Sequence, residues 1–352
     1  MFTHPDFDGH ESVTWLQDPG TGLRAVIAVH STALGPGMGG CRVWTYADAA
    51  EGLTDALRLS RGMSLKNAMA DLPLGGGKAV IFGPLPGPGT ARSAAFRAFG
   101  RAVAGLGGRY VTAEDVGVGV ADMAAVAQET GFVSGLAQSG DAVGGDPSPF
   151  TALGVLRGIE AAVARRFGRT DLAGCHVAVQ GVGNVGGALC RLLAERGARL
   201  TLADADSARA LALAAELGAV TTDPGVILET PADVFAPCAL GGVLTMQSVG
   251  RLGAAVVAGA ANNQIWDEAA GAALAARGVT YVPDYVINAG GIIAVGAEYL
   301  GGQTRADVLA AVEAIGPRVG ALLDRAQADG VRVDLLADRM ALEKIAAARH
   351  GG

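Results

Sequence analysis

The sequence has little lysine, and its basic residues are fewer than its acidic ones. Only Lys66, Lys78 and Lys344 are lysines among 27 basic residues, against 34 acidic residues. The net charge is −7 and the pI is about 5.3. Such a chain lacks the basic surface that binding to nucleic acid or to an anionic membrane requires. The charge therefore favours work on small molecules.

Cysteine is also scarce, and long apolar runs are missing. The four cysteines form no CxxC pair and the five histidines form no HExxH motif, so we expect neither a metal site nor a disulfide framework. The most apolar windows, such as residues 252–261, are too short to cross a bilayer, and the first residues lack the features of a secretory signal. These absences predict a cytoplasmic protein with reduced thiols.

Glycine, in contrast, is abundant. The 54 glycines show no three-residue period, which excludes a collagen-like helix and indicates tight turns and close backbone approaches. A length of 352 residues is enough for two domains with a core each. Residues 135–150 combine Gly, Ser, Asp and Pro without periodicity, which is typical of a linker. We therefore expect one domain over residues 1–138 and a second over residues 139–329.

The first predicted domain mixes strand and helix patterns. Residues 23–30 predict a strand, and a helix follows Asp48, with Glu51 three positions later in a capping-box arrangement. Residues 79–82 predict a short buried strand, and another helix begins near Thr90. This part is therefore expected to be an α/β domain.

In the second predicted domain, short apolar runs alternate with helical stretches. This alternation predicts a doubly wound parallel sheet, which binds ligands beyond the carboxyl ends of its strands. The six runs are residues 175–180, 199–204, 219–222, 234–239, 255–262 and 279–283.

A GxGxxG motif follows the first of these runs and opens a helix. Its first glycine makes a tight turn, its second lets the backbone approach a pyrophosphate, and its third lets the helix pack on the strand. Asp204 ends the next run, where a carboxylate can hold ribose hydroxyls and repel a 2′-phosphate. The pattern predicts an NAD-binding domain; in the alternative, Asp204 only caps the following helix. The motif residues are Gly181, Val182, Gly183, Asn184, Val185 and Gly186.

Residues 75–78 read GGGK, and this stretch does not fit a P-loop. Leu72 stands where that motif needs its first glycine, and Ala79 stands where it needs a hydroxyl residue. We expect the missing side chains of Gly76 and Gly77 to let a substrate approach the lysine. Alanine at either glycine should then damage catalysis more than folding.

Lys66 and Lys78 lie twelve positions apart in a chain that otherwise avoids lysine. Two nearby ammonium groups lower each other's pKa, so one lysine could act as a base while the other binds an anionic substrate. Asp115, which follows a predicted strand, could relay a proton or balance charge. In the alternative, the lysines are surface residues and Asp115 is a loop cap.

Seven stretches together resemble the NAD-dependent amino-acid dehydrogenases that act on leucine, valine and phenylalanine, which are relatives of glutamate dehydrogenase. The similarity runs through nearly the whole chain in order. The stretches are residues 31–44, 61–81, 107–117, 179–189, 234–242, 257–264 and 282–291.

The resemblance implies oxidative deamination of an L-amino acid to a 2-keto acid and ammonia. It makes Lys78 the lysine that activates water at the imine carbon, and it makes Asp115 the group that exchanges protons with the amino group. Lys66 would bind the substrate carboxylate near Gly39 and Gly40. A homo-oligomer, a cleft between the domains and a C-terminal helix, about 330–352, that returns to the first domain are also implied. The implied or weaker contacts of the cofactor, one of them shared with the substrate, are Thr151, Cys238, Ala239, Ala260, Ala261, Asn262, Arg42, Ser148 and Arg209.

The residues that line the substrate side-chain pocket in this family are apolar here. Glutamate-specific relatives place a lysine where Met38 stands, so a buried second carboxylate would have no partner. The AED tripeptide at 113–115 and the bulk of Ile292 favour leucine, valine or isoleucine over phenylalanine, although the adaptable Met38 leaves broad specificity open. The matched pocket positions are Met38, Met63, Ala113, Ile292 and Val295.

Two alternatives remain at this point. The first is a phenylalanine dehydrogenase, because one methylene in an apolar pocket is worth only about 1–3 kcal/mol. The second is a non-catalytic NAD-binding module. A module of that kind has no chemical need for Lys66, Lys78, Asp115 and Asn262 together.

Overall fold

The computed structural model describes residues 2–136 and 144–351, so the predicted domain boundary at 138/139 lies outside the described residues. The chain forms two compact units. Unit 1 comprises Met1–Asp146, Ile292–Val308 and Met340–Gly352, and unit 2 comprises Pro147–Gly291 and Leu309–Arg339. This division differs from the predicted one because Ile292–Val308 groups with unit 1.

Unit 1 is built on a five-stranded mixed sheet in the order β1-β2-β4-β3-β5. The pairs β1–β2 and β2–β4 are antiparallel, whereas β3 is parallel to both β4 and β5. The strands are β1 (Ser12–Asp18), β2 (Leu23–Ser31), β3 (Gly37–Trp44), β4 (Gly75–Phe82) and β5 (Tyr110–Ala113). The helices that pack on the sheet are α1 (Ala49–Met69), α2 (Thr90–Gly105) and α3 (Val120–Ala127).

Alternating side chains of the unit 1 strands form two apolar layers, one on each face of the sheet. Val26 and Ala28 of β2 pack with Leu57 of α1. Ile27, on the opposite face of the same strand, belongs to the cluster that contains Phe96 of α2. The first unit is therefore an α/β domain, as predicted.

The predicted start of α1 is confirmed. The Asp48 carboxylate accepts a hydrogen bond from the backbone N–H of Glu51 at 2.8 Å. The Glu51 carboxylate, however, accepts from the backbone N–H of Ala47 at 2.8 Å, one residue before the helix cap. The helix N-terminus is thus stabilised by a close variant of the capping box.

Two buried histidines join the N-terminal segment to α1. His30 is 4% exposed, and its Nδ1 lies 2.8 Å from Ser64 Oγ. His10 is 6% exposed, and its ring centre lies 4.9 Å from that of His30. Burial and the neighbouring His10 lower the pKa of His30 to about 4, against the opposing effect of the Asp8 carboxylate. The fold therefore favours the neutral form of His30.

This histidine should make unit 1 sensitive to acid. Because the folded state holds His30 neutral down to about pH 4, the unfolded state binds the extra proton first as the pH falls below about 6.5. The stabilisation is present above pH 6.5, is lost as the pH falls towards 4, and amounts to about 3 kcal/mol. Urea denaturation between pH 7 and pH 4 measures it. The same loss in His30→Gln as in the parent chain would assign it to other groups.

Unit 2 contains a six-stranded sheet in the order β11-β10-β9-β6-β7-β8, and every pair is parallel. All six predicted apolar runs are strands, which confirms the doubly wound sheet. The strands are β6 (His176–Gln180), β7 (Arg199–Ala203), β8 (Val220–Thr221), β9 (Ala232–Pro237), β10 (Ala254–Val257) and β11 (Thr280–Tyr281).

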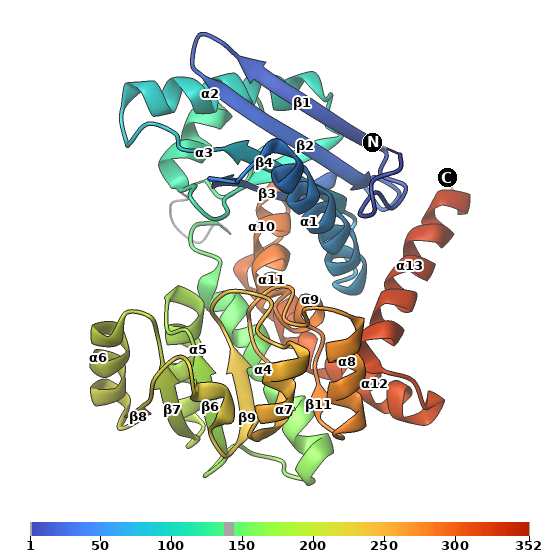
Figure 1. Ribbon diagram of the computed structural model, residues 1–352. Coiled ribbons are helices and arrows are strands. Elements are labelled where there is room, and N and C mark those ends of the chain that lie inside the picture. Colours follow the sequence, from blue (N-terminus) through green and yellow to red (C-terminus); the bar gives the residue numbers. More distant parts are fainter. Residues whose placement is uncertain (1, 137–143, 352) are drawn as a thin grey trace. The chain divides into compact units, whose positions relative to one another are not determined.

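Helices cover this parallel sheet, and the chain leaves and re-enters the unit through α10, α11 and α13 (Figure 1). One core cluster joins Phe235 of β9 to Val249 of α7 and Leu274 of α8. The helices of unit 2 are α4 (Ser148–Phe167), α5 (Asn184–Glu195), α6 (Ser207–Leu217), α7 (Met246–Arg251), α8 (Glu268–Ala276), α9 (Asp284–Ile287) and α12 (Ile315–Asp329), with a 3₁₀ turn at Ile227–Glu229. The remaining helices are α10 (Gly290–Leu300), α11 (Arg305–Glu313) and α13 (Val333–Gly351).

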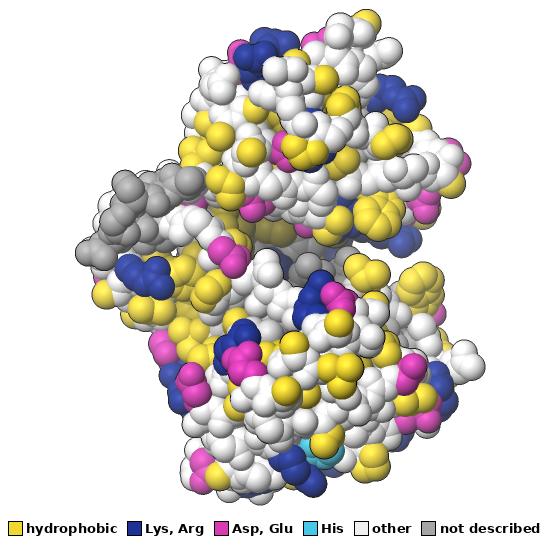
Figure 2. All heavy atoms as spheres, turned by 90° about the vertical axis from the view of Figure 1, so that its left-hand side faces the viewer, with side chains coloured by type: hydrophobic (Ala, Val, Ile, Leu, Met, Phe, Trp, Pro, Cys, Tyr) yellow, Lys and Arg dark blue, Asp and Glu magenta, His cyan; other side chains and the backbone are white. Residues whose placement is uncertain are grey.

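The surface carries both signs of charge. On the face that Figure 2 shows, Lys and Arg side chains are interspersed with Asp and Glu side chains. Among residues 2–136 and 144–351, no helix is long and apolar enough to span a membrane.

Candidate functional site

A buried ion pair connects two strands of unit 1. Lys78 lies on β4 and is 6% exposed, and its Nζ is 2.5 Å from Oδ2 of Asp115, which follows β5. Strand β3 runs between these two strands, so the Asp115 side chain must cross it. A Cβ on Gly40 of β3 would lie 2.9 Å from the Cβ of Asp115, closer than such atoms approach. Glycine at position 40 therefore gives Asp115 room to reach Lys78.

A second cation holds the same carboxylate. Arg42 Nε donates to Asp115 Oδ2 at 3.2 Å, and Arg42 Nη1 donates to Asp55 Oδ2 at 2.9 Å. The Tyr46 hydroxyl also donates to Asp55, at 2.5 Å. Burial alone would raise the pKa of Asp115, but the charges of Lys78 and Arg42 outweigh it and hold this pKa well below its ordinary value. Asp115 is therefore ionised, and its position is fixed from two sides.

Both Lys78 and Arg42, for which the sequence predicted separate roles, contact Asp115. The structure pairs Lys78 with a carboxylate, and the predicted effect of Lys66 on its pKa stays a prediction. Arg42, which was predicted as a weak cofactor contact, uses its guanidinium to bridge Asp55 and Asp115. The cofactor contact of Arg42 also stays a prediction.

The β3–β4 ladder beside Lys78 is interrupted at two glycines. The pairing of β3 with β4 skips Gly39 and Gly40, although the residues on both sides of them are paired. The buried Tyr110 hydroxyl donates to the Gly39 carbonyl at 2.7 Å. This interruption lies in the segment where the predicted substrate carboxylate would meet the backbone.

Lys66 belongs to the last turn of α1 and is partly buried. It lies one helical turn after Met63, so the two side chains share a face of the helix. A Cβ on Gly39 would lie 3.1 Å from Met63 Cγ, which places this face of α1 beside the interrupted part of the β3–β4 ladder. The structure thus brings Lys66 and Met63 to the part of unit 1 that holds Gly39.

The GGGK stretch is part of β4 and not a loop, which corrects the predicted strand start. A Cβ on Gly76 would lie 2.2 Å from the backbone nitrogen of Ser64 in α1, and a Cβ on Gly77 would lie 2.6 Å from the Tyr110 ring. Asn67 of α1 also donates to the Gly75 carbonyl at 2.6 Å. The glycines therefore let α1 and Tyr110 pack closely on β4, and the expectation that they let a substrate approach Lys78 stays a prediction.

Three of the predicted pocket residues lie in one apolar cluster. Met38 of β3 is fully buried there, and Ile292 and Val295 of α10 are partly buried against it. Ala113 is 6% exposed at the end of β5. Composition alone did not identify the remaining members of the cluster, which are Leu72, Leu74, Val111, Phe132 and Tyr299.

In unit 2, the three motif glycines have distinct environments. Gly181 has a φ of +90°, and a Cβ there would lie 2.7 Å from the Ala239 side chain. A Cβ on Gly186 would lie 1.9 Å from the Gly181 carbonyl oxygen. A Cβ on Gly183, in contrast, would meet nothing within 4 Å, and Gly183 directly precedes α5. Gly181 thus forms the turn, Gly183 leaves the backbone open to a ligand, and Gly186 allows close packing. This arrangement fits a phosphate at the N-terminus of the helix.

Asp204 lies beside this turn. Its Oδ2 accepts from the Val182 backbone N–H at 2.7 Å, and its Oδ1 accepts from the Asp206 N–H at 2.8 Å. The cap of α6 is Asp206, which accepts from the Arg209 N–H, so the alternative that Asp204 caps this helix is wrong. The Arg209 guanidinium forms ion pairs with both aspartates, at 3.6 Å and 3.2 Å.

The other predicted cofactor contacts follow β9 and β10 or begin α4. Cys238 and Ala239 come directly after β9, and Ala260 to Asn262 come shortly after β10. Strand order reverses at β6, whose neighbours are β7 and β9, and ligands bind parallel sheets at such a position. Ser148 and Thr151 lie in the first turn of α4, where Thr151 Oγ1 donates to the Pro147 carbonyl at 3.1 Å.

Within residues 2–136 and 144–351, no group of three His, Cys, Asp or Glu side chains could hold a metal ion.

The comparisons with known proteins agree with this architecture. Residues 10–132 match the family model for the Glu/Leu/Phe/Val dehydrogenase dimerisation domain, and residues 206–351 match the Glutamate/Leucine/Phenylalanine/Valine dehydrogenase model. The chain is 46% identical to a leucine dehydrogenase of Geobacillus stearothermophilus over 98% of this chain and 93% of that protein. It is 42% identical to a phenylalanine dehydrogenase of Bacillus thermotolerans over 96% and 89% of the two chains.

A solved structure gives the same result. The L-tryptophan dehydrogenase of Nostoc punctiforme has a TM-score of 0.82 and 40% identity, with 97% of each chain covered. The dinucleotide-type sheet and these relatives together imply a nucleotide cofactor. The chain belongs to the Glu/Leu/Phe/Val dehydrogenase family and is an amino-acid dehydrogenase.

Proposed function

We propose that this enzyme uses NAD to convert an aliphatic L-amino acid, namely leucine, valine or isoleucine, to the 2-keto acid and ammonia. The observation that carries the proposal is the buried Lys78–Asp115 pair, in a chain 46% identical to a leucine dehydrogenase. Unit 1 supplies the residues for the amino acid, and unit 2 supplies those for the dinucleotide.

The residues of unit 1 have separate tasks in this proposal. Lys66 binds the substrate carboxylate beside the backbone of Gly39 and Gly40. Asp115 takes a proton from the amino group, and Lys78 removes a proton from the water that attacks the imine carbon. The 2.5 Å contact between Nζ and Oδ2 offers a direct route for a proton between these two groups.

The dinucleotide would be held in unit 2 and would accept the hydride from Cα. The open face of Gly183 and the N-terminus of α5 would bind its phosphates. A carboxylate accepts up to about four hydrogen bonds, so Asp204 can hold ribose hydroxyls in addition to its two backbone N–H groups. The same carboxylate repels a 2′-phosphate, which favours NAD over NADP.

The apolar cluster around Met38 supports an aliphatic substrate. Its members are all uncharged, so the second carboxylate of glutamate would be buried there without a partner. The leucine and phenylalanine dehydrogenases above have similar sequence identities to this chain. The preferred side chain of the substrate therefore has to be determined from measured turnover rates.

A substrate panel tests the proposal. With NAD at alkaline pH, kcat/KM for leucine should exceed that for phenylalanine by about tenfold and that for glutamate by about 1,000-fold. NADP in place of NAD should lower the rate with leucine. Absence of NADH formation with every apolar L-amino acid would overturn the proposal, and a preference for phenylalanine would replace its substrate.

We also propose a homo-oligomer assembled through unit 1, because the family model over residues 10–132 describes a dimerisation domain. A cytoplasmic location belongs to the same proposal and is consistent with the four free cysteines. Light scattering after size-exclusion chromatography measures the assembly, and a monomer at micromolar concentration would contradict it.

A further inference from the structure

The Lys78–Asp115 pair continues into a row of alternating charges in unit 1. Asp115 Oδ2 lies 2.5 Å from Lys78 Nζ and 3.2 Å from Arg42 Nε. Arg42 Nη1 in turn donates to Asp55 Oδ2 at 2.9 Å. These four side chains, here called the charge row, are two cations and two anions. Each charge in the charge row therefore contacts a charge of the opposite sign.

A tyrosine hydroxyl holds Asp55, the last member of the charge row. The Tyr46 hydroxyl donates to Asp55 Oδ2 at 2.5 Å. Burial and the Asp55 carboxylate raise the pKa of Tyr46 well above its ordinary value, so the hydroxyl keeps its proton. The Tyr46 ring packs edge-on against Phe82 with the ring centres 6.0 Å apart, a contact that phenylalanine could make equally well. The hydroxyl is therefore better explained by its bond to Asp55 than by the packing of the ring.

A glycine in α1 brings Asp55 close to the sheet. Gly52 lies three positions before Asp55, so both residues lie on the same face of the helix. A Cβ on Gly52 would lie 2.4 Å from Cε1 of Phe82, the last residue of β4. Because Gly52 has no Cβ, the start of α1 can lie close to the end of β4. Strand β3 pairs with β4 at this end, which puts Arg42 within reach of Asp55.

Partly exposed ion pairs add little to the stability of a fold. The contacts of Tyr46, Asp55 and Arg42, however, all lead to one carboxylate, that of Asp115. In the proposed mechanism this carboxylate takes a proton from the amino group. Proton transfer depends steeply on geometry, since a shift of about 1 Å in a reacting group can cost about 100-fold in rate. The orientation of Asp115 is therefore a better explanation of the charge row than the stability of unit 1.

We propose that Asp55 and Tyr46 are positioning residues, which fix the guanidinium of Arg42 so that it holds Asp115 in place for proton transfer. This inference rests on the proposed function for the role of Asp115. It adds Asp55 and Tyr46, which the sequence did not single out, and both act through Arg42. It also gives Arg42 a task other than the predicted contact with the cofactor.

Asp55→Ala tests the hold on Arg42. With leucine and NAD, this variant should lower kcat by about tenfold and leave KM for leucine within about twofold, because proton transfer suffers and substrate binding does not. Asp55→Asn keeps the shape and one acceptor oxygen, so it should retain more activity than Asp55→Ala. Tyr46→Phe removes only the hydroxyl and should lower kcat by about threefold. An unchanged kcat in Asp55→Ala would overturn the proposal.

A double-mutant cycle tests whether Asp55 acts through Arg42. In an Arg42→Ala chain, the further change Asp55→Ala should lower kcat by less than about twofold. Equal losses with and without Arg42 would show that Asp55 acts independently and would overturn the proposal. The dissociation constant of NADH, measured by fluorescence, should stay within about twofold in Asp55→Ala. A weakening of NADH binding as large as the loss of kcat would show that the charge row serves the cofactor, which also overturns the proposal.

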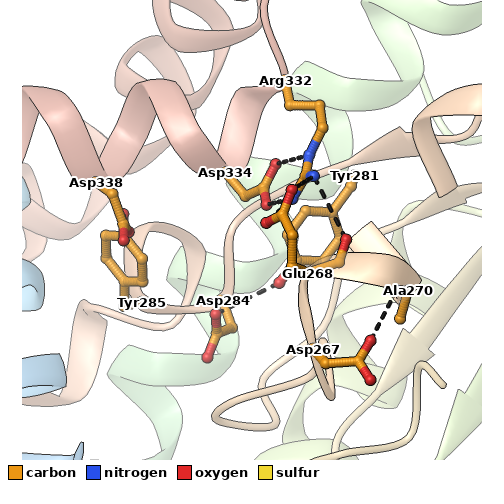
Figure 3. Close-up of polar contacts among 9 residues, drawn as sticks. All are labelled: Asp267, Glu268, Ala270, Tyr281, Asp284, Tyr285, Arg332, Asp334 and Asp338. Carbon is orange, nitrogen blue, oxygen red and sulfur yellow. Dashed lines mark hydrogen bonds and ion pairs between the residues drawn. The ribbon is translucent and has the colours of Figure 1, made fainter. Parts of the chain in front are cut away.

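Arg332 of unit 2 provides a matched control, because it also bridges two carboxylates (Figure 3). Its guanidinium contacts Glu268 and donates to Asp334 at 2.5 Å, and its side chain is 15% exposed, against 22% for Arg42. Glu268→Ala therefore removes a comparable ion pair, and kcat should stay within about twofold of the parent value. Equal losses of kcat in Glu268→Ala and Asp55→Ala would show a general effect of destabilisation and would overturn the proposal.

Crystal structures separate this inference from the proposed function. In Asp55→Ala, the guanidinium of Arg42 should turn and lose its 3.2 Å hydrogen bond to Asp115, whether or not the enzyme acts on leucine. An Arg42 that still donates to Asp115 in this variant would overturn the inference. A parent chain that binds NADH but turns over no amino acid refutes the proposed function, and the crystal structure of Asp55→Ala alone then decides on the role of Asp55.

Discussion

Replacing Lys78 by alanine should lower kcat by about 1,000-fold, the scale expected when a group that transfers a proton is removed. Lys78 is nearly fully buried and lies 2.5 Å from Asp115, so no exposed cation can take its place without moving the strands. Steady-state formation of NADH from leucine measures the loss. Arg42 remains beside Asp115 in this variant, so the carboxylate keeps one partner and the chain should fold.

The other two lysines provide matched controls. Lys344 lies on α13, where its ammonium contacts Asp71 and donates to the Ala68 carbonyl, and Lys344→Ala should leave kcat within about twofold of the parent. Lys66→Ala should mainly raise KM for the amino acid, because it removes a contact made before and during the reaction. A Lys78→Ala enzyme with full activity would contradict the assigned mechanism.

Replacing Gly76 by alanine should destabilise the fold by about 3 kcal/mol or more, because the new Cβ has no space. It would lie 2.2 Å from both the backbone nitrogen and the hydroxyl of Ser64, and 2.5 Å from the Ser60 carbonyl. Relief requires α1 to move away from β4. The measured quantities are the free energy of unfolding in urea and the yield of folded protein.

Gly62 of α1 is the control for this variant. A Cβ at Gly62 would meet nothing within 4 Å, and alanine there should stabilise the helix by up to about 1 kcal/mol. If Gly76→Ala folds as stably as the parent and loses only activity, the glycine serves the substrate and the packing explanation fails.

The parallel sheet of unit 2 was predictable because its strands are covered by helices, so each reads as a continuous apolar run. Strand β3 was not predicted, since three of its eight residues are glycines, which are depleted in strands. The start of β4 was not predicted for the same reason, because this strand begins with three glycines. In both strands, contacts with α1 and Tyr110 outweigh the local preference, and such contacts cannot be seen in the sequence around them.

The grouping of Ile292–Val308 with unit 1 also depends on distant contacts. Ser134 donates to the Val295 carbonyl at 2.9 Å, and the Glu298 carboxylate accepts from the Leu136 N–H at 2.9 Å. More than 150 positions separate the members of each pair. The apolar composition of α10 fits either unit equally well.

The candidate site was partly predictable. The closeness of Lys78 and Asp115 was expected, and the geometry confirms it. The bridge from Arg42 to Asp115 spans 73 positions, so this contact belongs to no local motif. It became evident only from the folded chain.

The apolar cluster around Met38 also bears on how the substrate range of this enzyme could be redesigned. Met38 is fully buried on β3, the strand that carries Gly39, Gly40 and Arg42, so enlarging the pocket there would disturb the groups that hold Asp115. Ile292 and Val295 contact the same cluster from α10, which carries none of these groups. Libraries for directed evolution towards bulkier amino acids should therefore start from α10 and leave β3 intact.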